Sequence, residues 1–159
     1  VLPPEKWREY CMASVTTHDL PPTLGYLESG HVRLREQLGL LLEPVEQELA
    51  VAERERDMWV ERLIAFGVLD EALAGDHVEV MLAMHRYLRL TNSKVLVASL
   101  ADAAGEKRAQ NQPGTMNEYP NWRVPLADSG GKSLKLEDLF TADLPRRVAD
   151  VMNGDRQDS

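Results

Sequence analysis

Two short apolar runs lie far apart in the sequence and have the pattern of buried β-strands. The first covers residues 10–17, which are mostly apolar or β-branched, and His18, Asp19 and a Pro-Pro pair follow it. The second, at residues 93–100, contains a continuous apolar stretch of the kind found in strands covered by helices on both faces. Because prolines lack an amide donor and restrict the preceding residue, His18 and Asp19 are predicted to lie in a loop at the carboxyl end of the first strand.

The segment between these runs has the apolar spacing of helices. A long helix is predicted to begin at Pro44, whose missing amide is harmless in a first helical turn, and to end at Gly67. Its many charges predict a solvent-facing side rather than an acidic docking surface. A further helix is predicted from Asp76, as its cap, to Leu90.

The last third of the chain is less regular. Residues 105–132 are rich in glycine and proline, which predicts a functional loop or disorder, and Tyr119 and Trp122 indicate that part of it packs. Residues 136–140 and 142–152 are predicted to form terminal helices. Strand, helices, strand, helices is the order of an α/β protein, but two strands do not make a stable parallel sheet alone.

Composition narrows the possible functions. The chain has 159 residues, 43% of them hydrophobic, and 18 basic against 26 acidic residues give a net charge of −8. This acidic balance argues against nucleic acid and against anionic membrane surfaces as partners. No apolar run approaches the roughly 18 residues that a membrane span needs. The start lacks both a basic leader and an initiating Met, and we expect a cytoplasmic segment cut from a longer chain.

Metal and thiol chemistry find little support in the sequence. His18, His31, His77 and His85 have no helical partner at the spacing of a zinc site, and Cys11 has no second cysteine and no base nearby in the sequence. We expect no metal and no cofactor. His85, on an apolar stripe, is expected to be a core histidine with one nitrogen satisfied, whereas His31 and His77 are expected to be solvated.

Two groups of polar residues could carry chemistry. A carboxylate beside an imidazole at a strand's carboxyl end, as in Asp19 and His18, is typical of barrel and open-sheet enzymes, although both side chains could instead bond the turn at the prolines. Amides, aromatic rings and an arginine in residues 111–123 suit sugar hydroxyls, or alternatively a rigid loop. Asn111 fits either reading, and Trp122 is expected to be structural.

These motifs, taken together, resemble a known family. The Thr-His-Asp-Leu-Pro-Pro motif in residues 14–26, followed by Asn-Gln-Pro-Gly-Thr at 111–115 and Glu-Tyr-Pro-Asn-Trp-Arg at 118–123, resembles the C-terminal part of bacterial 4-α-glucanotransferases. These enzymes, also called amylomaltases or disproportionating enzymes, form glycoside hydrolase family 77. The Pro-Pro pair and the helical stretch look most like the actinobacterial form.

The resemblance implies a fold and a set of roles. The family fold is a (β/α)₈ TIM barrel with added helices, and its members move α-1,4-glucan segments to glucose or malto-oligosaccharide acceptors through a covalent glycosyl-enzyme. Asp19 corresponds to the family's transition-state-stabilising carboxylate, His18 to a histidine that binds the sugar at subsite −1, and Asn111 to the loop lining the same end of the cleft. Trp122 and Arg123 match positions expected to hold the C-terminal segment against the barrel.

The implied division of the chain places barrel strands 7 and 8 in a helix-rich α/β fragment. Its parts are strand 7 with the catalytic loop, a helical insertion, strand 8, a substrate-side loop and terminal helices, at residues 1–20, 21–92, 93–104, 105–132 and 133–159.

The resemblance also implies that the nucleophile and the acid/base lie on earlier strands, outside these residues, and Asp102 has no motif that could replace them. We therefore expect the segment alone to be inactive, with the remainder of the barrel as its partner and self-association as a way to cover its strand edges. The alternative is a non-catalytic helical module that binds sugar or protein through residues 105–132. A hydrolase of the same clan is a lesser option.

Overall fold

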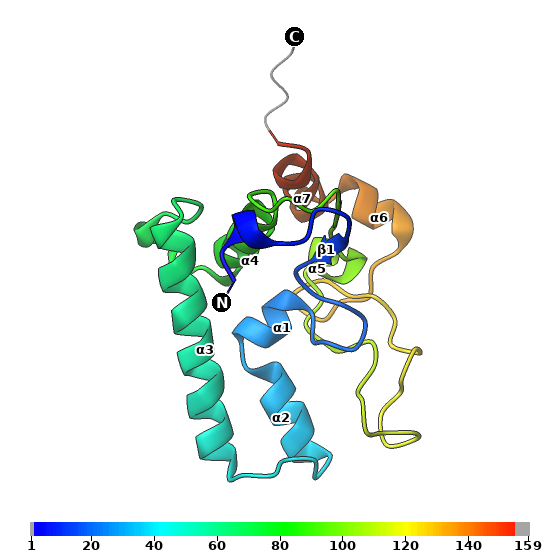
Figure 1. The fold of residues 1–159 in the computed structure, drawn as a ribbon. Helices are drawn as coiled ribbons and strands as arrows, with labels where there is room; N and C mark the ends of the chain where they lie inside the picture. The colour runs from blue at the N-terminus through cyan, green and yellow to red at the C-terminus, as the bar shows by residue number, and fades with distance from the viewer. Residues whose placement is uncertain (1, 155–159) are drawn as a thin grey trace.

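Helices are the predominant regular elements of the structure, a computed structural model that describes residues 2–154 (Figure 1). The helix-rich α/β pattern expected from the sequence is therefore present. The elements, in chain order, are η1 (Pro4–Lys6), β1 (Met12–Ser14), α1 (Thr23–Leu27), α2 (Gly30–Gln37), α3 (Val45–Ala65), η2 (Glu71–Leu73), α4 (His77–Leu88), β2 (Val95–Val97), α5 (Leu100–Ala104), α6 (Leu136–Thr141) and α7 (Asp143–Asn153).

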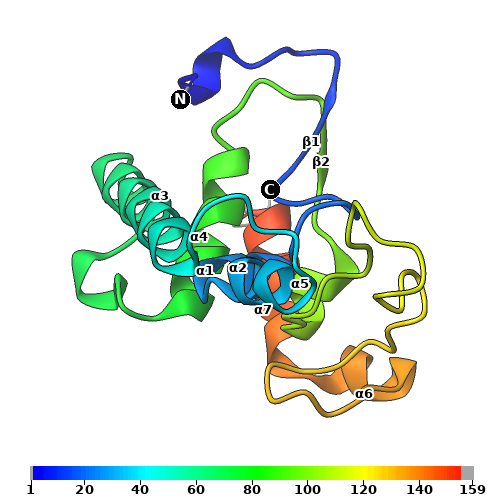
Figure 2. The ribbon, with the colours of Figure 1, turned by 90° about the horizontal axis from the view of Figure 1, so that it is seen from below.

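The two predicted strands pair in parallel, with Ala13 opposite Leu96 in the register (Figure 2). Ala13 is buried at 5% exposure, but Met12 and Val95 are 70% and 51% exposed. Within residues 2–154 the sheet is therefore covered on one face only, and not on both faces as the apolar runs predict. Within the described chain α4 packs against β1, and Met12 and Val95 lie opposite each other on the uncovered side.

Helix α4 is the centre of the hydrophobic core. It contacts α1, α3, α7 and β1, and its residues from Val80 to Leu88, apart from Arg86, are buried. Leu24, Leu27, Leu63 and Val148 bring side chains from α1, α3 and α7 into the same core. The Asp76 cap is confirmed, since its Oδ1 accepts the amides of residues 78 and 79.

The long helix α3 runs along one side of the molecule beside α2 (Figure 1). It begins one residue after Pro44, which is its cap, and ends before Gly67, whose φ of +68° suits a glycine after a helix. Only Ala52 and Leu63 of α3 are buried, so the predicted solvent-facing side is confirmed.

His85 confirms its prediction, whereas His31 does not. The Nδ1 of His85 lies 2.9 Å from the carbonyl oxygen of Met81, and its ring is fully buried. His31, expected to be solvated, instead stacks on Tyr26 at a centroid distance of 5.4 Å, with a buried Nδ1 that has no hydrogen-bond partner. Burial lowers the pKa of His31, and Arg35 lowers it further.

Asp102 has partners that its sequence neighbourhood does not reveal. It is 1% exposed, and its oxygens accept the amide of Thr23 at 2.7 Å and the Thr23 hydroxyl at 2.8 Å. The Nε2 of His85 lies 3.8 Å from its Oδ2. Asp102, in α5, is thus hydrogen-bonded to Thr23 in α1, and its role is structural.

The terminal helices are confirmed as α6 and α7, and α7 ends before Gly154. The last five residues of the predicted terminal segment, and Val1, lie outside the described residues. No described helix is both long enough and apolar enough to cross a membrane.

Candidate active site

The loop after β1 places Asp19 at the surface. The Thr16 hydroxyl donates to the carbonyl oxygen of Pro21 at 2.9 Å, and the Leu20 amide donates to that of Thr17 at 3.1 Å. These bonds form the turn that precedes α1 without using the side chains of His18 or Asp19. Both side chains are more than half exposed.

Asp19 lies between the other two predicted site residues. The Asn111 amide donates to its Oδ1 at 2.7 Å, and Nε2 of His18 lies 3.2 Å from its Oδ2. The structure therefore brings together a carboxylate, an imidazole and an amide from segments more than ninety residues apart. The alternative in which Asp19 and His18 only bond the proline turn does not match these contacts.

Asn111 projects from a loop whose two sides are joined by hydrogen bonds between residues 109–110 and residues 119 and 122, here called the neck of the loop. The Trp122 amide donates to the carbonyl oxygen of Gln110 at 2.8 Å, and the Tyr119 hydroxyl donates to that of Ala109 at 2.6 Å. These bonds hold the two sides of the loop together next to Asn111.

Asn121 braces the same loop from within. Its Oδ1 accepts the Gln112 amide at 2.8 Å, and its Nδ2 donates to the Thr115 hydroxyl at 2.8 Å. The loop is thus ordered by its own polar residues, as the rigid-loop alternative expects, while Asn111 remains directed at Asp19.

Trp122 and Arg123 do not pack into the core of the described chain, and their expected role against the barrel stays a prediction. Trp122 is 63% exposed, and its ring lies 5.3 Å from the His18 ring, centroid to centroid, at an angle of 43°. Arg123 is exposed and lines the cleft described below. Both belong to the site side of the loop rather than to the core, because the loop neck turns them outward.

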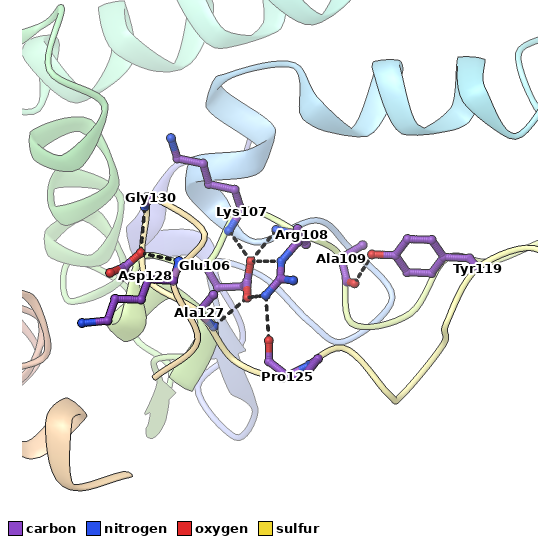
Figure 3. Close-up of polar contacts among 10 residues, drawn as sticks. Glu106, Lys107, Arg108, Ala109, Tyr119, Pro125, Ala127, Asp128 and Gly130 are labelled. Carbon is purple, nitrogen blue, oxygen red and sulfur yellow. Dashed lines mark hydrogen bonds and ion pairs between the residues drawn. The ribbon is translucent and has the colours of Figure 1, made fainter. Parts of the chain in front are cut away.

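The base of the loop is fixed by Glu106, which sequence analysis did not single out (Figure 3). This carboxylate is 1% exposed and accepts the amides of Lys107, Arg108 and Ala127, each at 2.9 Å. The Arg108 guanidinium adds two further bonds to it, at 2.9 and 2.7 Å, and donates to the carbonyl oxygen of Pro125 at 2.7 Å.

Electrostatics keep Glu106 ionised. Burial alone would raise its pKa, but the hydrogen bonds from Arg108 and from the Ala127 amide hold the pKa below its usual 4.5. The sequence does contain a signal for this ion pair, since Glu106 and Arg108 lie two residues apart just after Gly105, the glycine that ends α5. Helix α1 packs directly against the base of the loop. A Cβ at Gly25 would collide with the carbonyl oxygen of Lys107, so only glycine allows this approach.

A cleft of about 710 Å³ opens beside Asp19, between α2 and the loop. This volume lies within the usual range for small-molecule sites. Its wall is mostly apolar by area, and the polar side chains along it include Asp19, His31, Arg35, Arg108, Asn111 and Arg123. Within residues 2–154, no three histidine, cysteine or carboxylate side chains are grouped closely enough to hold a metal ion.

The fold and the site together define a class of protein. In α/β enzymes with parallel strands, ligands bind beyond the carboxyl ends of the strands. Here Asp19 follows the end of β1, and the cleft lies next to it. The chain therefore has the architecture of part of an α/β enzyme with a polar site at the carboxyl edge of its sheet.

Comparison with known proteins identifies the family. The family model described as 4-alpha-glucanotransferase, glycoside hydrolase family 77, matches residues 1–129, and the chain belongs to this family. The resemblance seen in the sequence motifs is thereby confirmed.

Individual relatives agree. The 4-alpha-glucanotransferases of Mycobacterium bovis and Mycobacterium tuberculosis are each 55% identical over 140 residues, covering 88% of this chain and 19% of theirs. That of Haemophilus influenzae is 27% identical over 122 residues. The crystal structure of amylomaltase from Corynebacterium glutamicum matches 94% of this chain and 22% of its own, with a TM-score of 0.84 and 38% identity. The chain thus spans about a fifth of the length of these relatives.

Proposed function

We propose that this chain is part of a 4-α-glucanotransferase that moves α-1,4-glucan segments to glucose or malto-oligosaccharide acceptors with retention of configuration. The observation that carries the proposal is the position of Asp19, held between His18 and Asn111 at the edge of a cleft. Membership of the family and similarity to an amylomaltase support it.

In this proposal Asp19 stabilises the transition state. Retaining transfer uses one carboxylate as nucleophile and a second as acid and base, and the ring develops positive charge as the glycosidic bond breaks. A third carboxylate can bind the hydroxyls of the flattened ring. Asn111 occupies one lone pair of Oδ1 and fixes the carboxylate plane, and further lone pairs remain for the sugar.

His18 and Asn111 have supporting roles in binding the sugar at subsite −1. The imidazole contacts Asp19 through Nε2, which leaves Nδ1 directed elsewhere. Asn111 contributes a carbonyl oxygen as well as the amide that holds Asp19. Amide, imidazole and carboxylate together match the alternating donors and acceptors of neighbouring sugar hydroxyls.

The proposal assigns β1 and β2 to strands 7 and 8 of a (β/α)₈ barrel, with the nucleophile and acid/base supplied by the remainder of the enzyme. Their parallel pairing and the large helical connection support this assignment. The division into five segments given above remains a prediction, as does a cytoplasmic location, with which the single free cysteine is consistent.

The test is Asp19→Asn in the full-length enzyme, assayed by disproportionation of malto-oligosaccharides. The substitution keeps the shape and removes the charge, so we expect kcat to fall by about 10²–10³-fold, as when other transition-state-stabilising groups are removed. The melting temperature should change little, because Asp19 is exposed.

The matched control is Asp57→Asn, which removes an exposed carboxylate from α3 and should leave kcat unchanged. If Asp19→Asn retains full activity, Asp19 is only a loop residue. If the intact wild-type protein binds glucans but transfers none, the non-catalytic binding module is the better account.

A further inference from the structure

Trp122 combines two features that are individually unfavourable. Its φ is +62°, a left-handed conformation that is unfavourable for most residues other than glycine and asparagine, and its large apolar side chain is 63% exposed. Ser29 is the only other non-glycine residue with positive φ in the described chain. Packing does not explain the choice of tryptophan at this position, because little of the side chain is buried.

The backbone conformation places residue 122 at the neck of the loop. Its amide donates to the carbonyl oxygen of Gln110 at 2.8 Å, and the next amide, of Arg123, donates to that of Pro120 at 3.0 Å. The turn therefore sets Trp122 across from residues 110 and 111. Any residue able to adopt this conformation could make these backbone bonds, so they do not require an indole ring.

The ring itself contacts His18. The two ring centroids are 5.3 Å apart, which is an ordinary distance for an attractive aromatic pair. On the opposite side of the neck, Asn111 donates to Asp19 at 2.7 Å. Two neighbouring points on one loop thus hold two consecutive residues of the Thr-His-Asp motif, one through an aromatic contact and one through a hydrogen bond.

We propose that Trp122 is a positioning residue that fixes the His18 imidazole for sugar binding, an inference that rests on the proposed function of the site. Nε2 of His18 faces Asp19 at 3.2 Å, and the indole restricts rotation of the ring. Nδ1 has no hydrogen-bond partner among residues 2–154 and is thereby held available for a sugar hydroxyl. The orientation of this histidine therefore depends on a tryptophan that is both strained and exposed.

The experiment compares three substitutions in the full-length enzyme. Trp122→Asn removes the ring but introduces a residue that tolerates the left-handed conformation. This variant should lower kcat/KM about tenfold without lowering the melting temperature. Trp122→Phe retains an aromatic partner and should stay within about threefold of the wild type. Trp7→Asn, at a tryptophan outside the site, should leave kcat/KM unchanged.

A double-mutant cycle shows whether Trp122 acts through His18. If it does, Trp122→Asn should weaken glucan transfer and malto-oligosaccharide binding in the wild type but have little further effect in a His18→Ala background. Independent, multiplicative effects would overturn the inference, as would full activity of Trp122→Asn. Failure of the proposed function itself is distinguishable, because the wild-type protein would then transfer no glucan.

Discussion

Asp102 is a buried carboxylate with a task unlike that of Asp19. Both of its oxygens accept hydrogen bonds from Thr23, whose hydroxyl is itself in a position that is only 2% exposed. A buried anion is stabilised by such donors, and losing one leaves part of the carboxylate unsatisfied. The Thr23 hydroxyl therefore contributes to stability through Asp102 rather than through its own burial.

Replacing Thr23 tests this role. Thr23→Val has nearly the same shape but lacks the hydroxyl, so we expect the free energy of unfolding to fall by about 1–3 kcal/mol. Thr23→Ser keeps the hydroxyl and should lose less. The stability of both variants is compared with that of the wild type by the midpoint of urea denaturation. Equal midpoints for the wild type and Thr23→Val would mean that the bond to Asp102 contributes nothing.

At the scale of elements, the base of the loop in residues 105–132 is held by one ionised side chain. Glu106 connects the end of α5 to the segment at Ala127. Asn111 lies five residues after Glu106 in the sequence. The pKa of Glu106 is lower in the folded protein than in the unfolded chain, because Arg108 and three amides bind the charged form. The stabilisation is complete above the unfolded value of 4.5 and is lost as the pH falls through the lower, folded value.

This linkage predicts a local opening in acid. The hydrogen-exchange protection factor of the Ala127 amide should be constant above about pH 5 and fall progressively below 4.5. Glu106→Gln removes the charge and loses bonds to a charged group worth about 1.5–3 kcal/mol, so it should lower protection at neutral pH and abolish the pH dependence. A pH dependence that survives in Glu106→Gln would assign the opening to another group.

The elements themselves were largely predictable. Apolar spacing, caps and glycine signals located α3, α4 and α7, because these features act within a few residues of one another. Strand burial was overestimated, since it depends on what covers the sheet, and that is not encoded locally. His31 was misjudged for another reason: the left-handed Ser29, between α1 and α2, sets His31 against Tyr26, and serine is not a residue that predicts this conformation.

The site was predictable through its motifs, and its supports were not. His18, Asp19 and Asn111 were selected for their chemistry and their resemblance to a family, and the structure brings them together. The partnership of Asp102 with Thr23 joins residues 79 apart, and the contact of Trp122 with His18 depends on a single left-handed turn. No local pattern reports either contact.

At the scale of the whole molecule, the chain exposes apolar side chains on one side of its sheet and around α6. Large apolar side chains gathered at the surface are typical of a face that another part of a protein covers. The exposed residues concerned are Tyr10, Met12, Val95, Leu100, Leu136 and Phe140. In the proposed enzyme, the barrel strands and helices contributed by the remainder of the protein would cover this surface.

The isolated 159-residue chain is expected to have no glucanotransferase activity. In the proposed enzyme this chain carries the stabilising carboxylate, and the remainder of the protein supplies the two carboxylates that make and break the glycosidic bond. Incubation with malto-oligosaccharides should give no change in chain-length distribution by chromatography, whereas the full-length enzyme should give a ladder of products. Glucan transfer by the isolated chain would require a nucleophile among these residues and would refute the assignment.

The parallel pairing of β1 and β2 has a consequence for the order of folding. Met12 meets Val95 across 82 intervening residues, and parallel strands cannot be closed by a short turn. Helices and their local contacts form quickly, whereas distant pairings form slowly because the ends of a long loop must first meet. We expect the helices between the strands to form first and the contact of Asp19 with Asn111 to form last, because that contact needs both strands in place.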